Sequence, residues 1–244
     1  MEKDVINRVK HKVNYKKLNI SNLDKIGGID ISPVSDDNGL CVVTITVLSY
    51  PSLEILKVYN ENSNIIDGYV PSFLAIRESK PIEKAFKNFI KTVNINDIPS
   101  IFFVDGNGRL HERECGLATQ IGVELDIITI GVSKNYYPIN SKSKPKSQST
   151  SKLFKDSSQH LLTSRGDFIG LFNKTSNYYL GVALLTSNNS KNPIFVSSGN
   201  KITLECAIAL TLMTTSNKFK IPQSIRIADM YGRKSIRNLV NDNN

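Results

Sequence analysis

Short apolar runs separated by turn-forming residues dominate the first part of the chain. Residues 26–31 form one apolar run, residues 41–48 are rich in β-branched side chains, and residues 53–59 alternate between apolar and polar positions. Such runs are typical of β-strands. An Asp-Asp-Asn-Gly sequence at 36–39 and a Pro-Ser pair at 51–52 predict tight turns between the runs. Three strands joined by short turns predict an antiparallel meander.

The segment 72–90 has the hydrophobic period of an α-helix. Its apolar residues, among them Phe86 and Phe89, recur at spacings of three and four. Pro81 lies inside this segment, and proline lacks the backbone N–H that a helix interior needs. The pattern therefore predicts two helices that meet near 79–81, with Pro81 in the first turn of the second.

The middle of the chain alternates between strand and helix. Residues 101–104 form a short apolar run that ends at Asp105, residues 112–123 have a helical pattern, and residues 127–132 form another apolar run. A strand, a helix and a strand at this spacing predict a parallel pair with a crossover connection.

The C-terminal part of the chain adds both kinds of element. Strands are expected at 168–172, 178–185 and 193–196, and helices at 202–213 and from Pro222 onward. Together these elements predict an α/β fold with one mixed sheet. An antiparallel meander is followed by parallel strands, and helices cover both faces.

The same patterns predict one domain, over residues 23–234. Residues 1–22 are basic and are expected to form an arm or a short helix. Residues 140–152 are rich in Ser and Lys, contain no large apolar side chain and predict a loop or disordered insertion. The Asn-rich end, 235–244, is expected to fray.

The composition is that of an ordinary globular chain. Of the 244 residues, 40% are hydrophobic and 22% are charged, which supplies one sizeable core and excludes a disordered chain, collagen and a disulfide scaffold. No apolar run approaches the roughly 18 residues that span a bilayer, and the polar N-terminus does not resemble a secretory signal. Cys41, Cys115 and Cys206 form no Cys-x-x-Cys pair and favour a reduced cytoplasmic or nuclear compartment.

The charge balance points to a polyanionic partner. The formal net charge is +9, from 31 Lys and Arg residues against 22 Asp and Glu residues. A balance this basic favours nucleic acid first and an anionic membrane surface second. Composition does not choose between these two partners.

Three carboxylates fall where a sheet edge can gather them. Asp30 ends the first apolar run, Asp105 ends the central strand and precedes Gly-Asn-Gly, and Glu78 lies in the helical segment between them. Carboxylate oxygens are the ligands that Mg²⁺ and Mn²⁺ prefer, and such an ion can clamp a phosphodiester and activate water. The alternative is that Asp30 and Asp105 are turn acids and Glu78 is a solvated helix acid.

Seven short segments occur in a recognisable order between about residue 25 and residue 230. They are Gly28-Ile29-Asp30-Ile31-Ser32, residues 69–78 (YVPSFLAIRE), Val104-Asp105-Gly106-Asn107-Gly108, residues 111–118 (HERECGLA), residues 130–134 (IGVSK), residues 196–202 (VSSGNKI) and an element from Pro222 to Asp229. In this order they resemble the endonuclease V family, inosine-directed nucleases with a ribonuclease H-like fold. The resemblance covers most of the chain.

The resemblance implies a role for each matched residue. Asp30, Glu78 and Asp105 match the metal-binding carboxylates of the family, and Lys134 matches its active-site lysine. Tyr69-Val70-Pro71 matches the wedge that enters the strands beside the lesion, where an aromatic ring can replace lost base stacking. The positions that match the pocket around the flipped hypoxanthine are Ser72, Leu74, Gly106, Gly108, His111, Gly116 and Gly131. For His111, a pocket wall and nearby structural support are equal alternatives.

The sequence departs from the family pattern at three positions. Asn200 stands where the family usually has a histidine that lies beside the metal site, Gln120 stands at another usual histidine, and Ser72 replaces a usual glycine. Asn cannot exchange a proton near neutral pH. Asn200 is therefore either a neighbour of the active site or the cap of a helix that starts near Lys201.

The resemblance implies a metal-dependent endonuclease that cuts the second phosphodiester bond 3′ of inosine or deoxyinosine, with Mg²⁺ as the ion and Mn²⁺ as a substitute. The expected substrate is single-stranded RNA or DNA that contains inosine, with RNA favoured because the Asp-Gly-Asn-Gly turn resembles eukaryotic members. The protein is expected to act as a monomer in the cytoplasm or nucleus, without a membrane. Two alternatives are an inactive module that binds inosine-containing RNA, motivated by Asn200, and a ribonuclease H-like nuclease of different specificity.

Overall fold

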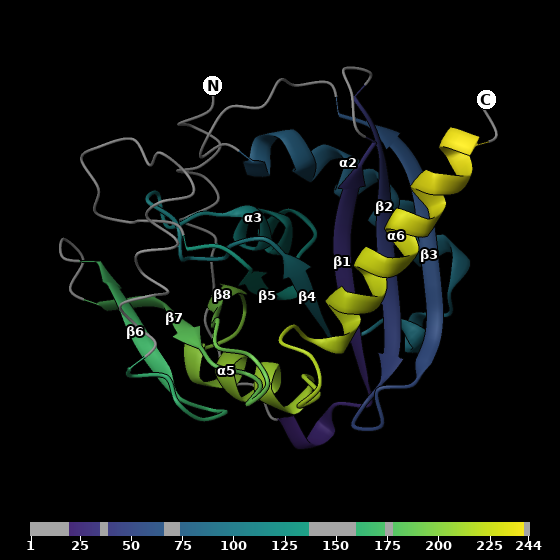
Figure 1. Ribbon diagram of the computed structural model, residues 1–244. Helices are drawn as coiled ribbons and strands as arrows, with labels where there is room; N and C mark the ends of the chain where they lie inside the picture. Colours follow the sequence, from purple (N-terminus) through teal and green to yellow (C-terminus); the bar gives the residue numbers. More distant parts are fainter. Residues whose placement is uncertain (1–19, 35–38, 66–73, 137–159, 174–177, 242–244) are drawn as a thin grey trace.

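The computed structural model describes residues 20–34, 39–65, 74–136, 160–173 and 178–241 (Figure 1). The strands are β1 (Lys25–Pro33), β2 (Leu40–Ser49), β3 (Ile55–Asn64), β4 (Ile101–Asp105), β5 (Ile128–Ser133), β6 (Phe168–Asn173), β7 (Tyr178–Leu184) and β8 (Ile194–Asn200). The helices are α2 (Leu74–Phe89), α3 (Leu117–Glu124), α5 (Leu204–Met213) and α6 (Gln223–Asn241), with 3₁₀ turns at Ile20–Asn22, Ile90–Thr92 and Ile95–Asp97.

The eight strands of the described residues form one mixed sheet in the order β3-β2-β1-β4-β5-β8-β7-β6. The first three strands pair antiparallel, β1, β4 and β5 pair parallel, and β8, β7 and β6 continue antiparallel. The predicted fold class, an antiparallel meander followed by parallel strands, is confirmed. The parallel centre explains why residues 101–104 are an unbroken apolar run, because that strand is covered on both faces.

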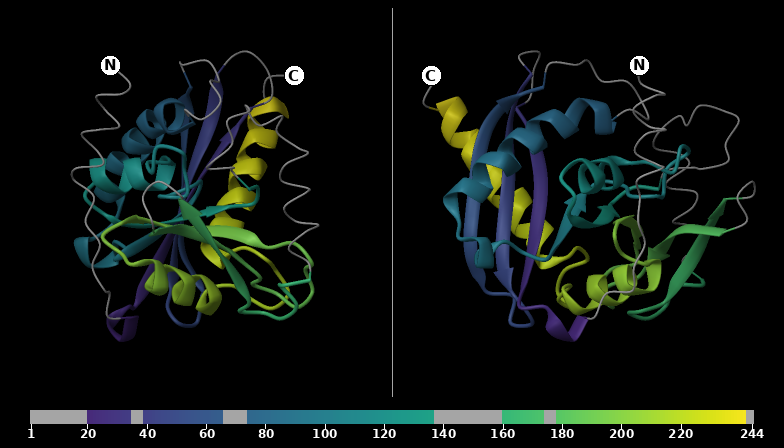
Figure 2. Two further views of the ribbon diagram at one scale, coloured as in Figure 1. Left: turned by 90° about the vertical axis from the view of Figure 1, so that its left-hand side faces the viewer. Right: turned by 180° about the vertical axis from the view of Figure 1, so that it is seen from behind.

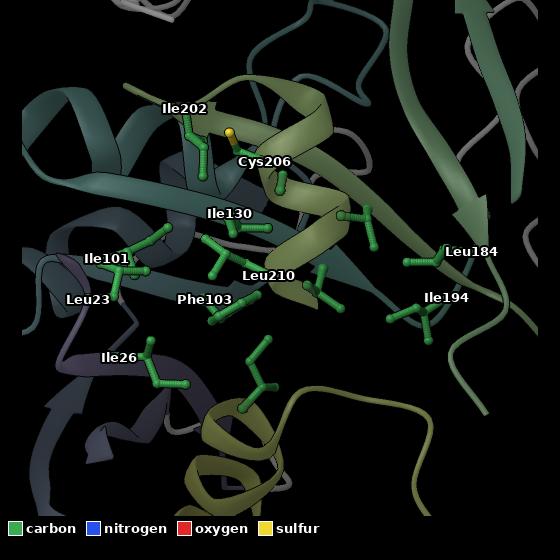
Figure 3. Close-up of a cluster of buried hydrophobic side chains, with 14 of the residues drawn as sticks. Leu23, Ile26, Ile101, Phe103, Ile130, Leu184, Ile194, Ile202, Cys206 and Leu210 are labelled. Carbon is green, nitrogen blue, oxygen red and sulfur yellow. The ribbon is translucent and has the colours of Figure 1, made fainter. Parts of the chain in front are cut away.

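Helices cover both faces of the sheet, as predicted (Figures 1 and 2). Successive residues of a strand point to opposite faces. Ile26 and Phe103 therefore join the cluster under α5 and α6, part of which is drawn in Figure 3. Ile29 and Phe102 join the cluster under α2 and α3. Among the described residues, no helix combines the length and the apolarity that a membrane crossing needs.

The prediction of two helices meeting at Pro81 is wrong, because α2 is one helix with Pro81 inside it. Its apolar face is continuous through the proline, and Ile82, Phe86 and Phe89 are buried against the sheet. A proline inside a helix costs about 3 kcal/mol. Burying each large apolar side chain contributes about 1.5–3 kcal/mol, so packing on the sheet outweighs the lost backbone hydrogen bond.

Two helix limits also differ from the prediction. The helix expected over 112–123 begins only at Leu117, because Glu114 has a left-handed backbone with φ of 54° and the chain before it is folded into a loop. The tail expected to fray from 235 is helical as far as Asn241. Asn60 of β3 donates a hydrogen bond of 2.9 Å from Nδ2 to Oγ of Ser235, which holds this part of α6 on the sheet.

Several predicted segments lie outside the described residues. They are the arm at 1–19, the turn at 36–38, the wedge at 69–71 with Ser72, and the insertion at 140–152. The strands that flank the predicted turn, β1 and β2, pair antiparallel over nine residue pairs from Lys25 with Ser49 to Pro33 with Cys41.

Candidate active site

Three parallel strands bring the first group of site residues to one edge of the sheet. Asp30 lies on β1, Asp105 is the last residue of β4, and Lys134 follows β5 directly. Ile29 pairs with Val104, and Asp105 pairs with Val132. Because parallel strands end at the same edge, residues far apart in the sequence meet there.

Helix α6 closes this edge and contributes a fourth acid, Asp229. A cavity of about 580 Å³ lies between β1, the ends of β4 and β5, and α6. Its charged lining residues are Asp30, Asp105, Lys134, Asp229, Arg233 and Arg237. The helix lies close to the sheet at Gly232, where a Cβ atom would come within 2.7 Å of the Ser32 hydroxyl oxygen.

The site role of Asp229 was missed from the sequence, although the residue ends the last of the matched segments. A signal was present, since Asp229, Arg233 and Arg237 recur every four residues and so share one face of a helix. Arg233 Nε donates a hydrogen bond of 2.8 Å to Oδ1 of Asp229. The sequence shows this charged row, but only the position of α6 shows that it faces the other carboxylates.

Glu78 reaches the same group of charges from α2 and is 9% exposed. Burial, with smaller contributions from the charges of Asp30 and Asp105, outweighs the opposing charge of Arg77 and raises the pKa of Glu78 to about 8. Asp30 is 7% exposed. Burial, followed by the charges of Asp105 and Asp229, raises its pKa to about 7. The structure thus gathers the three carboxylates predicted from the sequence into one electrostatically coupled group.

Lys134 brings a cation to three of these acids, Asp105, Asp229 and Asp30. Its Nζ donates to Oδ2 of Asp105 at 3.0 Å, and its side chain remains 36% exposed. Burial alone lowers the pKa of Lys134, but the charge and hydrogen bond of Asp105 outweigh burial and the pKa is raised. Lys134 therefore stays charged at neutral pH and faces the cavity.

The donor chemistry of the site suits a hard divalent cation. Carboxylates of β1, β4, α2 and α6 interact electrostatically, and a positive charge among them would relieve the repulsion and desolvation that raise the pKa of Asp30 and of Glu78. As the side chains stand, no three His, Cys, Asp or Glu residues of the described ranges are arranged to hold an ion. Asp105 is bonded to Lys134, and Asp30 accepts a hydrogen bond of 3.2 Å from the Ser32 hydroxyl. The residues fit the ion by charge and donor type.

The loop that joins β4 to α3, residues 106–116, carries most of the predicted base-pocket residues. Gly108 and Gly116 of this loop, and Gly131 of β5 beside it, pack tightly against the chain's own backbone. A Cβ atom on Gly131 would lie 2.2 Å from the Gly108 nitrogen, and one on Gly116 would lie 2.3 Å from the Asn107 carbonyl oxygen. Glycine is required at these positions for the loop to pack, and direct reading of a base by this backbone stays a prediction.

The remaining pocket residues lie in or near the same region. Gly106 bridges to Val132 through its backbone N–H at 2.8 Å. His111 is 7% exposed, and its Nδ1 accepts a hydrogen bond of 3.2 Å from the Arg113 N–H. Leu74 is the first residue of α2. His111 therefore has a structural contact inside the loop, and a role in a pocket wall stays a prediction.

Asn200 does not lie at the carboxylates, so its interpretation as an active-site neighbour is wrong. Strand β8 runs antiparallel to β5, which pairs Asn200 with Thr129 near the start of β5, whereas Lys134 follows the end of that strand. The two ends are separated by about 16 Å at the rise of a strand. Asn200 is 1% exposed, and its Nδ2 donates to the carbonyl oxygens of Gly122 and Ile127 at 2.7 and 3.1 Å.

The alternative role of Asn200 as a helix cap is also wrong. Thr203 caps α5, because its side chain accepts a hydrogen bond from the Cys206 N–H. Gln120, the other residue at a usual histidine position, is buried between helices. Its Nε2 donates to Oγ of Ser79 at 3.1 Å and to Oε1 of Glu124 at 2.9 Å. Both departures from the family pattern are accounted for by packing.

Comparisons with known proteins agree with this geometry. A sequence model of a family described as Endonuclease V matches residues 7–230, which span the four carboxylates and the lysine. Human endonuclease V is 32% identical over 217 residues, covering 89% of this chain and 73% of that protein. The crystal structure of its catalytic domain aligns with a TM-score of 0.86 at 30% identity, over 98% of this chain and 96% of that one. Ciona intestinalis endonuclease V, in complex with a 23-mer DNA containing an inosine followed by a ribo-adenosine, aligns with a TM-score of 0.86 at 27% identity, over 97% of this chain and 96% of that one.

Proposed function

Because the chain belongs to the endonuclease V family, we propose that it is a nuclease that hydrolyses a phosphodiester bond near inosine in RNA or DNA. The observation that carries this proposal is the cavity in which Asp30, Asp105 and Asp229 meet Lys134. The arrangement combines acidic oxygen donors with a cation beside them, which suits hydrolysis of a phosphodiester.

In this proposal Asp30, Glu78 and Asp105, joined by Asp229, hold Mg²⁺, for which Mn²⁺ can substitute. When bound, the ion polarises a phosphate oxygen and lowers the pKa of a coordinated water. The raised pKa of Asp30 and of Glu78 support this assignment, because buried carboxylates that repel one another are stabilised by a divalent cation.

Lys134 stabilises negative charge that develops on the phosphate oxygens during cleavage. Its ion pair with Asp105 keeps Nζ beside the carboxylates, and its partial exposure leaves it within reach of a substrate. We assign Arg233 to the positioning of Asp229, because its Nε donates a hydrogen bond to Oδ1 of that residue. Arg237 also lines the cavity, and it has no hydrogen-bond or ion-pair partner among the described residues. We assign it to the phosphate backbone beside the scissile bond.

The finer parts of the proposal come from the resemblance and from the Ciona relative. We propose that Tyr69-Val70-Pro71 enters the strand beside the base, that the loop 106–116 surrounds the flipped hypoxanthine, and that the second bond 3′ of the base is cut. The DNA bound to the Ciona protein carries a ribo-adenosine after the inosine, and therefore a 2′-hydroxyl at that position. We propose that RNA is the preferred substrate, because its 2′-hydroxyl groups distinguish it from DNA.

We propose that the protein works as a monomer in the cytoplasm or nucleus. Cys41, Cys115 and Cys206 are free and buried, which supports a reduced compartment. The alternative of an inactive module that binds inosine-containing RNA was motivated by Asn200. The structure removes the reason for this alternative, because the Asn200 side chain donates to the Gly122 carbonyl oxygen at the opposite edge of the sheet from the carboxylates and Lys134.

The test uses end-labelled single strands that differ only at one nucleotide. Strands of RNA, of DNA and of DNA with one ribonucleotide after the base, each carrying inosine, adenosine or guanosine, are incubated with Mg²⁺, with Mn²⁺ or with EDTA. We expect cleavage only beside inosine, only with a metal ion, and fastest in RNA. Asp105→Asn is the control and should bind the inosine strand without cutting it. Cleavage at the same rate beside adenosine, or cleavage in EDTA, would overturn the proposal.

A further inference from the structure

The loop 106–116 is fixed by hydrogen bonds to β8 and by apolar contacts with β6, β7 and β8. The Gly108 N–H donates to Oγ of Ser197 at 2.9 Å, and the Arg109 N–H donates to the Ser198 carbonyl oxygen at 2.8 Å, both on β8. Leu110 is fully buried in a small apolar cluster built from β6, β7 and β8, whose other fully described members are Leu171, Leu180, Ala183 and Phe195. The shape of this loop therefore depends on β6 and β7, which lie at the edge of the sheet (Figure 1).

Tyr178, the first residue of β7, contacts the polar side of the same loop. The Arg109 guanidinium carbon lies 4.4 Å from the centre of the Tyr178 ring, and Arg109 Nη2 is 2.9 Å from Oε2 of Glu114. The Tyr178 hydroxyl donates a hydrogen bond to Oε2 of Glu114. One tyrosine thus contacts both members of an ion pair that spans the loop from residue 109 to residue 114.

Glu114 needs such support because its backbone is in the left-handed region. Its φ is 54°, which costs a non-glycine residue about 1 kcal/mol or more, and such a conformation persists only where the surroundings fix it. The next two residues lead to Gly116, whose N–H donates to the Gly108 carbonyl oxygen at 2.9 Å and closes the loop. A change in the backbone at Glu114 would therefore move the glycines that the proposed base pocket uses.

We infer that Tyr178 is a positioning residue for base recognition: through Arg109 and Glu114 it holds the loop 106–116 in the shape that distinguishes hypoxanthine from adenine. This inference rests on the proposed function. Hypoxanthine and adenine differ by a carbonyl oxygen and a ring N–H, so discrimination requires backbone donors and acceptors at fixed positions. The contacts of Tyr178 are to Arg109 and Glu114 of the loop, and it is not among the residues that line the cavity with Asp30 and Asp105.

The neighbouring Tyr179 supplies a matched control. It is 61% exposed, its ring packs at 5.6 Å from the ring of Phe172, and a Cβ atom on Gly170 would strike it. The same substitution at positions 178 and 179 removes one tyrosine hydroxyl each, next to each other in the sequence. Only the substitution at position 178 removes a hydrogen bond to Glu114.

The test compares Tyr178→Phe, Tyr178→Ala and Tyr179→Phe by the ratio of kcat/KM for an inosine strand to that for the matched adenosine strand. Tyr178→Phe keeps the ring under Arg109 and loses only the hydroxyl. We expect the ratio to fall about 3- to 10-fold in Tyr178→Phe, since a partly exposed hydrogen bond to a carboxylate is lost, and further in Tyr178→Ala. Tyr179→Phe should leave it unchanged.

Two further measurements separate positioning from general stability. The thermal midpoint is recorded for every variant, and Tyr178→Phe is combined with Glu114→Ala. If Tyr178 acts through Glu114, the double variant should discriminate no worse than Glu114→Ala alone. A lower thermal midpoint with an unchanged ratio, or additive losses in the double variant, would overturn the inference. Wild-type protein that cuts both strands equally would instead overturn the proposed function, so the two failures are distinguishable.

Discussion

Replacing Asp30 with Asn should make the metal-free protein more stable at alkaline pH. Burial and the charges of Asp105 and Asp229 raise the pKa of Asp30 from 3.8 to about 7. Each pKa unit corresponds to about 1.4 kcal/mol, so ionised Asp30 lowers the free energy of unfolding by up to about 4 kcal/mol. Asn has the same shape and can still accept from the Ser32 hydroxyl, which is 3.2 Å from Oδ2 of Asp30.

The sign of the pH dependence follows from which state ionises first. Above about pH 4 the carboxyl of Asp30 is ionised in the unfolded chain but still protonated in the folded protein, so stability falls as the pH rises to about 7 and then levels off. Asp30→Asn removes this loss. Its gain should be near zero at pH 4 and about 2–4 kcal/mol at pH 8, after relaxation of neighbouring charges is allowed for.

The assay is urea unfolding of both proteins in EDTA at several values between pH 4 and pH 8.5. The difference in the free energy of unfolding between the variant and the wild type at pH 4 serves as the internal control for the same difference at pH 8. Packing effects of the substitution do not depend on pH and contribute equally to both differences. The variant should also be inactive in the cleavage assay with Mg²⁺. A gain that is the same at both pH values, or no gain at pH 8, would refute the electrostatic description of this site.

Three further substitutions test other parts of the site. Lys134→Met should lower the single-turnover cleavage rate by about 10²–10³-fold, because one charge-stabilising group is lost; an unchanged rate would exclude it from the chemistry. Arg237→Gln should reduce the salt dependence of binding to a single strand by about 0.7 in logarithmic slope, whereas Lys234→Gln, on the same helix but outside the cavity lining, should not. Asn200→Ala should lower the free energy of unfolding by about 1–3 kcal/mol by removing the two hydrogen bonds that the buried side chain donates to the Gly122 and Ile127 carbonyl oxygens, while the folded fraction cleaves at the wild-type rate. A slower folded fraction would connect Asn200 with catalysis.

The sequence was sufficient for the elements whose pattern is local. The β-branched run at 41–48 and the alternating run at 53–59 predicted strands, and the acids that end the apolar runs at Asp30 and Asp105 predicted where charge gathers. Asp30 and Asp105 could be grouped as acids at strand ends that can meet at one edge of a sheet, whereas the parallel pairing of β1 with β4 that brings them together is seen only in the structure. Lys134 was found through its motif alone, since a lysine after a strand has no pattern that separates it from a solvated one.

The structure decided everything that depends on how distant elements pack. Pro81 stays inside one helix because the sheet beneath α2 contributes more than the proline costs, and that burial cannot be read from the helix by itself. Asn200 ends a strand just as Asp105 does, but β8 runs in the opposite direction, so the same local pattern places it at the opposite edge. Asp229 belongs to the site only because α6 crosses β1 on its way back over the sheet. Local sequence thus determined which segments are strands and helices, whereas strand direction and helix docking, which are long-range properties, determined which of their polar residues meet.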